Sequence, residues 1–137
     1  MQPILTVSDL RVDRGRTTIL RDVAWQVRPG EHWVILGANG SGKTSLLKAL
    51  TGYLTPTAGD IAVLGRVFGE SDWRELRLKI GVVTSAFAAA IPPAEPALET
   101  VVSGKYAQLD LWKKITRDER RRALGLLRAI GASSLAN

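Results

Sequence analysis

The sequence contains no cysteine and only one histidine, His32, among its 137 residues. The absence of cysteine excludes a disulfide framework and a thiolate metal site, and it permits a reducing compartment without proving one. A lone histidine with no patterned acidic or cysteine partner indicates a structural or surface residue. The longest uncharged run, residues 80–94, holds two prolines and is too short to cross a bilayer. The N-terminus lacks a basic region followed by an apolar run, so no signal peptide is expected.

The composition is otherwise that of an ordinary globular domain with an excess of positive charge. Apolar residues make up 45% and charged residues 23% of the chain, which is the usual balance. The length is enough for one domain with a real core. The net charge of +6 favours association with polyanions such as nucleotides, nucleic acid or acidic lipid headgroups.

A glycine-rich segment stands out at residues 37–44, with the spacing G-x-x-x-x-G-K-T of a phosphate-binding loop. The apolar residues 33–36 before it predict a short buried strand, and the residues 44–50 after it predict a helix that ends before Gly52. Glycines allow backbone angles closed to other residues, so the loop amides and the positive end of the helix can cradle phosphate. A chance glycine-rich turn would lack this strand and helix context.

Two side chains of the loop have expected roles in this cradle. Lys43 is expected to reach the β- and γ-phosphates of a nucleotide, and Thr44 to place its hydroxyl on Mg²⁺. The predicted nucleotide-binding residues of the loop are Gly37, Ala38, Asn39, Gly40, Ser41, Gly42, Lys43 and Thr44.

The residues around the loop predict a small sheet. Before the loop, two strands are expected at residues 4–12, with a break near Asp9, and at residues 17–27, with a bend at Asp22. After the loop's helix, the pattern predicts further extended or helical pieces. These are a strand at residues 61–64, an extended piece at 67–69, a short helix at 71–76 capped by Ser71 or Asp72, and a second buried strand at 80–84.

The C-terminal part of the sequence is predicted to be helical. Residues 98–109 follow helical spacing, although Gly104 weakens the pattern. Thr116 and Glu119 form a capping box for a second helix that ends at Gly131. The apolar face of that helix is expected to hold Ala123, Leu124, Leu127 and Ile130. The tryptophans expected as core or interface anchors are Trp25, Trp33, Trp73 and Trp112. For Trp112, which lies beside Lys113 and Lys114, the alternative is a side chain that faces a partner.

The segment GANGSGKTSLL, from Gly37 to Leu47, resembles the Walker A segment of ATP-binding cassette (ABC) ATPases. The flanking segments TILRDVAWQVRPGEHWVILG, LTGYLTPTAGDIAVLG and LRLKIGVVTSAF resemble the surroundings of that loop in the family, so the resemblance covers nearly the whole chain. It implies an α/β fold, a P-loop NTPase half-domain of the ABC type with an antiparallel β-subdomain and the start of a helical subdomain. The segment Glu-His-Trp at residues 31–33 is similar to a soluble subgroup related to molybdate-import ATPases.

The resemblance also implies a division of the chain. Residues 1–85 would hold the P-loop nucleotide-binding core and the β-subdomain, residues 86–96 a linker, and residues 97–137 the start of the helical subdomain. Family members continue with a Leu-Ser-Gly-Gly signature, a catalytic glutamate and a switch histidine, none of which is present in this sequence. We therefore expect the N-terminal part of a longer protein, in which hydrolysis needs the complete dimeric cassette. The alternative is a non-catalytic nucleotide-binding or interaction module.

The family's ligands and site residues carry over to particular positions. The implied ligands are ATP and Mg²⁺, with Ser45 on the α-phosphate and Lys43 stabilising charge in the transition state. The resemblance implies Thr44 as a metal residue. Ser85 stands where the family usually has a metal-contacting glutamine and is a further candidate, although its side chain is two carbons shorter than that of glutamine. Arg14 stands where an aromatic residue commonly stacks on adenine; its guanidinium either stacks on the base or is a solvated turn residue.

The expected partners follow from the same resemblance. A second cassette or a homo-oligomer is implied, a membrane protein is a further candidate partner, and the expected location is the cytoplasm. A GTPase would need an Asn-Lys-x-Asp motif, and a kinase a second acidic strand end; neither is found. Nucleic acid is not an expected partner, because acidic residues lie beside the basic cluster of the second helix and no aromatics interleave it. That cluster consists of Arg117, Arg120, Arg121 and Arg122.

Overall fold

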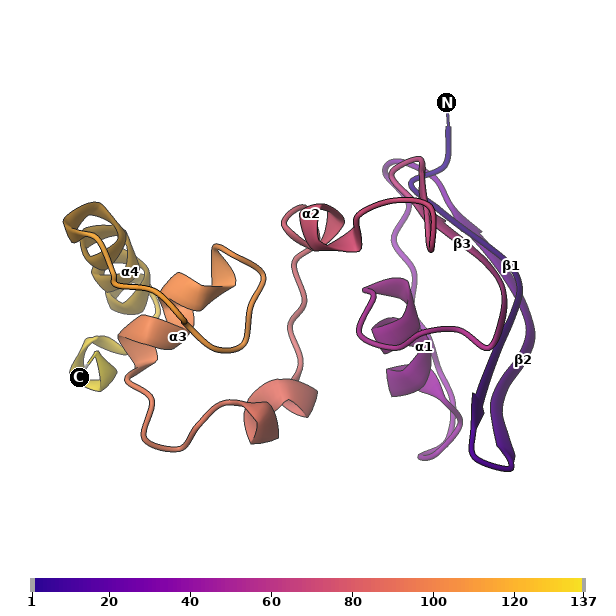
Figure 1. Ribbon diagram of the computed structural model, residues 1–137, viewed down its shortest axis with the longest axis horizontal. Helices are drawn as coiled ribbons and strands as arrows, with labels where there is room; N and C mark the ends of the chain where they lie inside the picture. Colours follow the sequence, from indigo (N-terminus) through magenta and orange to yellow (C-terminus); the bar gives the residue numbers. More distant parts are fainter. Residues whose placement is uncertain (1, 137) are drawn as a thin grey trace. The chain divides into compact units, whose positions relative to one another are not determined.

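A computed structural model describes residues 2–136, without the side chains of residues 86, 87 and 89 (Figure 1). The chain divides after Ile80 into two compact units. The first unit contains the sheet and the glycine-rich loop, and the second is helical. Among the described residues, no helix has both the length and the apolar content needed to cross a membrane.

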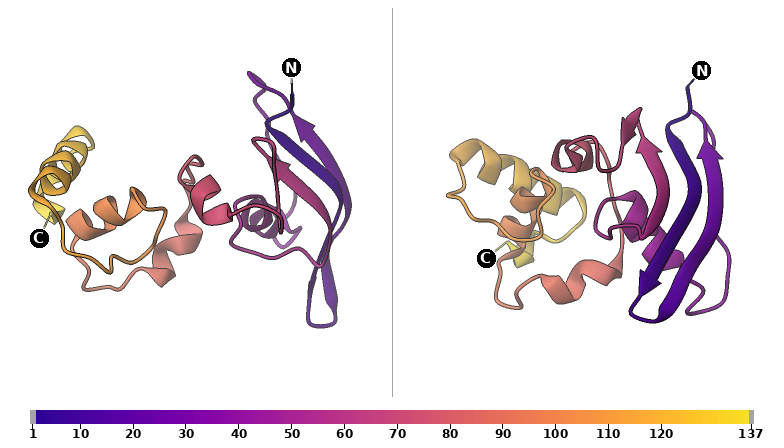
Figure 2. Two further views of the ribbon diagram at one scale, coloured as in Figure 1. Left: turned by 45° about the horizontal axis from the view of Figure 1, so that its top comes forward. Right: turned by 45° about the vertical axis from the view of Figure 1, so that its right-hand side comes forward.

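The first unit is built on a four-stranded antiparallel sheet (Figure 2). The strands are β1 (Leu5–Arg14), β2 (Thr17–Val27), β3 (Ala58–Val63) and β4 (Arg66–Val67), and they lie in the order β2-β1-β3-β4. The helix α1 (Lys43–Leu50) packs on the sheet, and α2 (Trp73–Arg77) closes the core beside it. The buried residues of this core are Val7, Leu10, Val12, Leu20, Leu46, Ala49, Leu50, Ile61, Trp73 and Leu76.

The predicted irregularities of the first two strands are confirmed. Asp9 and Asp22 have positive φ angles of 48° and 51°, and the β1–β2 register shifts between Val7 and Leu10. The backbone of β3 approaches that of β1 closely at this point. A Cβ on Gly59 would lie 2.4 Å from the carbonyl oxygen of Asp9. Glycine is therefore required at position 59 by both its φ of +85° and the available space.

Two predicted buried strands are wrong. Residues 33–36 lie outside the sheet, with Val34 79% exposed and Leu36 86% exposed. Residues 80–84 also form no strand, and Val83 is fully exposed. A β-strand forms only when its backbone pairs with a neighbouring strand, and no strand of the described sheet pairs with either segment. The apolar composition of these segments therefore predicted neither a strand nor burial correctly.

The second unit contains η1 (Ser85–Ala90), α3 (Ala97–Gly104), α4 (Arg117–Ala129) and η2 (Ser133–Leu135). Leu98 and Val102 of α3 pack against Ala123 and Leu127 of α4 to form a separate core. Helix α3 is shorter than the helical segment predicted at residues 98–109, because it ends at Gly104 and a turn follows it.

The capping box of α4 is confirmed, since Thr116 and Glu119 exchange both of its hydrogen bonds. The predicted burial of Ile130 is wrong: this residue follows the last helical position and is 75% exposed. Trp73 is a core residue as expected, whereas Trp112 is 87% exposed and lies outside the core.

Candidate nucleotide-binding loop

The glycine-rich loop turns sharply between residues 36 and 43. Gly40 and Gly42 have φ angles of +83° and +92°, which side chains other than hydrogen rarely allow. The amide of Ser41 donates to the carbonyl of Ala38 at 3.2 Å and closes the turn. These conformations explain why glycine recurs at this spacing in the sequence.

Side chains approach two glycines of the loop closely, and at Gly42 the backbone does so too. A Cβ on Gly37 would lie 2.6 Å from Ser41 Oγ, and a Cβ on Gly42 would lie 2.7 Å from Leu20 Cδ2. Because Leu20 belongs to β2 and is itself buried, the start of α1 is pressed directly against the sheet. The loop is therefore positioned by the core of the first unit.

The Lys43 side chain folds back along the loop. Its ammonium group donates to the carbonyl oxygens of Gly37 and Ala38, each at 2.7 Å. Because this charge lies beside the turn, the loop presents an ammonium and backbone amides together. An ammonium is a compact point charge that suits phosphate oxygens.

The N-terminus of α1 has the chemistry of an anion-binding site. Gly42 is the N-cap residue and offers no side chain to the first amides, and the first turn of α1 carries no acidic residue. The first amides of a helix need partners, and the helix dipole favours a negative charge there. The amides of Lys43, Thr44 and Ser45 therefore complete a cradle whose chemistry fits a polyphosphate.

The structure thus places the predicted loop residues, Gly37 to Ser45, in one continuous turn and helix start. Arg14 ends β1 opposite Thr17 at the hairpin, and its side chain is exposed. Ser85 begins η1 in the second unit. Among residues 2–136, no three carboxylate or histidine side chains gather as metal ligands would. The metal roles of Thr44 and Ser85 and the base-stacking role of Arg14 stay predictions.

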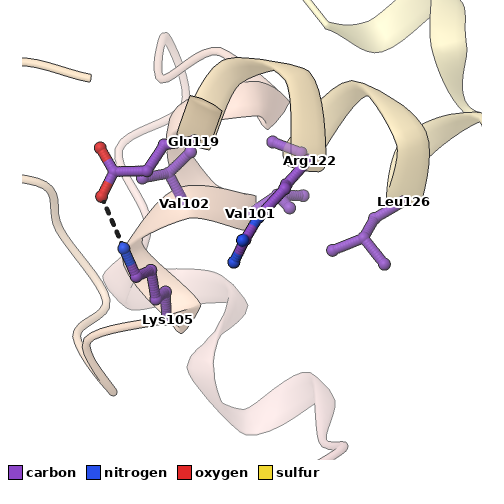
Figure 3. Close-up of a pocket in the computed structure, with 7 residues that line it drawn as sticks. Val101, Val102, Lys105, Glu119, Arg122 and Leu126 are labelled. Atoms are coloured by element: carbon purple, nitrogen blue, oxygen red, sulfur yellow. Dashed lines mark hydrogen bonds and ion pairs between the residues drawn. The ribbon is translucent and has the colours of Figure 1, made fainter. Parts of the chain in front are cut away.

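The sequence predicted Glu119 as part of a capping box alone. The structure also places it in a charged cluster of the second unit. The Glu119 side chain is only 7% exposed. Its carboxylate accepts hydrogen bonds from the hydroxyl of Tyr106, from Lys105 Nζ at 2.9 Å (Figure 3) and from Lys113 Nζ at 3.2 Å. The amide of Thr116 donates to the same carboxylate at 3.0 Å.

These contacts change the acid strength of the groups in the cluster. The Tyr106 hydroxyl, the Thr116 amide and the Lys105 ammonium lower the pKa of Glu119 well below its usual range. The pKa values of the two lysines rise, that of Lys105 mainly through Glu119 and that of Lys113 mainly through Tyr106. Sequence spacing gave no signal for these contacts, because they cross the loop between α3 and α4.

Comparisons with known proteins identify the same family that the loop motif resembles. The profile of the family described as "ABC transporter" matches residues 20–135. The uncharacterized ABC transporter ATP-binding protein YlmA of Bacillus subtilis (strain 168) is 40% identical over 135 residues, which are 98% of this chain and 51% of YlmA. YmeB of Lactococcus lactis subsp. lactis (strain IL1403), which is described in the same words, is 42% identical over 132 residues, 96% of this chain and 51% of YmeB.

Solved structures agree with the sequence relatives. The dimeric structure of MJ0796, a bacterial ABC transporter cassette, superposes with a TM-score of 0.76 at 25% identity, covering 97% of this chain and 60% of that chain. The predicted P-loop NTPase fold is therefore confirmed. The chain spans about half the length of the curated relatives it matches. The family profile and the relatives together show that this chain belongs to the ABC transporter family of ATP-binding proteins.

Proposed function

We propose that residues 37–45 bind the polyphosphate of ATP, and that the chain forms the N-terminal part of an ABC cassette. The observation that carries the proposal is a loop with two positive-φ glycines that leads into α1, whose first turn has no side-chain cap. Backbone amides in such a turn point at one centre and favour an anion there.

The chain's own residues would each supply a part of the binding. The amides of the loop and of Ser45 hold phosphate oxygens, and Lys43 exchanges the carbonyls of Gly37 and Ala38 for the β- and γ-phosphates. The Thr44 hydroxyl holds Mg²⁺, which when bound neutralises charge on the phosphates. Ser85 is a further metal residue of this proposal, and Arg14 is a candidate to stack on the base.

Hydrolysis, in this proposal, belongs to the complete cassette. Phosphoryl transfer to water needs a group that orients the water as well as the charges that bind phosphate. The 137-residue chain therefore binds ATP weakly and does not turn it over. A second cassette completes the site, a membrane protein is a candidate partner, and the chain works in the cytoplasm. The dimeric state named for the MJ0796 cassette supports the second-cassette part of the proposal.

Calorimetry with Mg·ATP tests the binding site directly. The wild-type chain should bind, and Lys43→Ala should weaken binding about 10- to 100-fold, the value of a hydrogen bond to a charged group. Lys48→Ala is the matched control. It removes the same positive charge, but from the last turn of the same helix. Absence of binding by a folded wild-type chain would refute the site. Steady ATP hydrolysis that Lys43→Ala abolishes would refute the inactivity of the chain alone.

A further inference from the structure

The positive charge of the chain is concentrated around α4. Residues 112–130 contain seven lysines and arginines and two carboxylates, which gives +5 of the chain's net +6. A charge density of this kind produces a local field that attracts anionic surfaces. None of these residues belongs to the proposed nucleotide-binding loop, so the patch is unexplained by ATP binding.

The charges of α4 are directed away from the packed core. Ala123 and Leu127 are buried against α3. At 100° per residue, Arg121 and Arg128 lie about 140° and 120° from the centre of this buried face, and Arg117 lies about 100° from it; all three are exposed. Arg120 lies about 40° from the centre of the buried face, on the flank of the helix, and is exposed as well. The second unit therefore presents a row of guanidinium groups that packing within the unit does not use.

Few carboxylates neutralise this row. Asp118 pairs with Arg121 at 2.7 Å. Glu119 is buried and paired with Lys105 (Figure 3) and with Lys113, so its ion pairs are made with these lysines and not with the arginines of the row. Among residues 2–136, no carboxylate lies within 4.0 Å of the other three arginines of the row. These are Arg117, Arg120 and Arg128.

A large aromatic residue precedes the row. Trp112 is 87% exposed, two lysines follow it directly, and Arg117 begins α4 five residues later. Exposing an indole to water is unfavourable, whereas the ring is stabilised at the boundary between lipid headgroups and acyl chains. Since the apolar face of α4 is packed against α3, Trp112 is the apolar side chain that this surface offers to the headgroup region, with the cationic side chains beside it.

We infer that Trp112 and the arginine row of α4 form a docking surface for an anionic phospholipid bilayer. Clusters of four to eight Lys and Arg residues on an amphipathic helix are typical of segments that bind acidic lipids. Arginine forks bind phosphate oxygens in pairs, which favours headgroup phosphates over diffuse charge. The surface binds lipid directly and does not require ATP or a protein partner.

Nucleic acid is the competing polyanion, and the aromatic residues disfavour it. Proteins that bind single strands stack successive bases on several aromatic rings. Tyr106 is the other aromatic residue whose side chain is described in this unit, and the ammonium groups of Lys105 and Lys113 lie 5.0 and 4.5 Å from its ring centroid. Because these lysines cover the Tyr106 ring, Trp112 would have to stack bases alone.

Vesicle co-sedimentation of the full chain tests the inference. Vesicles of phosphatidylcholine with one third phosphatidylglycerol should bind the chain, and pure phosphatidylcholine vesicles should not. The triple variant Arg117→Gln, Arg120→Gln, Arg128→Gln should bind about a hundredfold more weakly, since each cation near an acidic surface contributes about fivefold. Trp112→Ala should also bind more weakly, and Trp33→Ala, which removes an exposed tryptophan of the first unit, should not.

A charge-matched control separates this surface from the net charge of the chain. Arg16→Gln, Arg21→Gln, Arg28→Gln removes three exposed arginines of the first unit and should retain most of the binding. Circular dichroism confirms that each variant is folded. Equal losses in the two triple variants would overturn the inference, as would equal binding to both kinds of vesicle. Binding of single-stranded RNA at lower concentrations than vesicles, lost in the α4 variant, would assign the surface to nucleic acid instead.

Discussion

At the scale of single residues, Gly40 and Gly42 of the loop are required for different physical reasons. Gly40 and Gly42 share a positive φ, but only Gly42 is also confined by its neighbours. A Cβ at Gly42 would lie 2.7 Å from Leu20 Cδ2 and 3.1 Å from the carbonyl oxygen of Ile19, whereas a Cβ at Gly40 would meet nothing within 4 Å. The motif in the sequence predicted both glycines for one reason, and the structure adds a second reason for one of them.

The two glycines should therefore respond differently to alanine. Gly40→Ala places a side chain in the left-handed region and should lower the free energy of unfolding of the first unit by about 1 kcal/mol. Gly42→Ala adds a clash with the packed sheet and should cost about 3 kcal/mol in total. Urea unfolding followed by tryptophan fluorescence in a Trp112→Phe background measures the first unit, which holds the other three tryptophans. Equal costs for the two variants would contradict the close packing at Gly42.

At the scale of elements, helices and bends were predictable where their cause lies within a few residues. Asp72 caps α2 by accepting from the amide of Arg74 at 2.8 Å, and the capping box of α4 is equally local. The Glu119 cluster was not predictable, because Tyr106 and Lys113 reach the carboxylate across a loop whose path no spacing rule gives. Contacts of this kind fasten the segment between α3 and α4 to the start of α4.

Removing the Glu119 charge should loosen that segment. Glu119→Gln should lower the free energy of unfolding of the second unit near neutral pH by more than the control does, because it removes the charge that accepts hydrogen bonds from Tyr106, Lys105 and Lys113. Asp118→Asn is the control, since its exposed pair with Arg121 should contribute less than about 1 kcal/mol. Hydrogen exchange of the α4 amides, followed as denaturant is added, measures the stability of the second unit in both variants. A Glu119→Gln variant as stable as the control would contradict the role of the cluster.

The same contribution should depend on pH in a defined direction. The fold lowers the pKa of Glu119, so the unfolded chain takes up a proton at higher pH than the folded chain does. The stabilisation by Glu119 is therefore complete above the ordinary glutamate pKa and is lost progressively as the pH falls below about 4. The difference in stability between the wild type and Glu119→Gln should shrink over that acidic range. A difference that stayed constant down to low pH would argue against a charged carboxylate in the cluster.

At the scale of the whole molecule, the unpaired segments explain where sequence-based prediction failed. Local apolar patterns indicated β-propensity at residues 33–36 and 80–84, but strand pairing depends on partners distant in the sequence. Among residues 2–136, no strand pairs with either segment. The chain spans about half the length of its curated relatives.

Unpaired apolar backbone in the first unit should make the chain self-associate. Residues 33–36 expose Val34 and Leu36 almost fully, and no backbone hydrogen bond joins residues 32–36 to another described residue. Such a segment is a template for strand pairing with a second copy. Light scattering should give an average mass that rises with concentration, and Val34→Lys with Leu36→Lys should return it toward that of one chain, because two charges oppose pairing. Leu135→Lys, which changes a leucine of the second unit that is 60% exposed, should leave the association unchanged. A wild-type chain that stays monomeric at high concentration would show that these exposed residues do not pair.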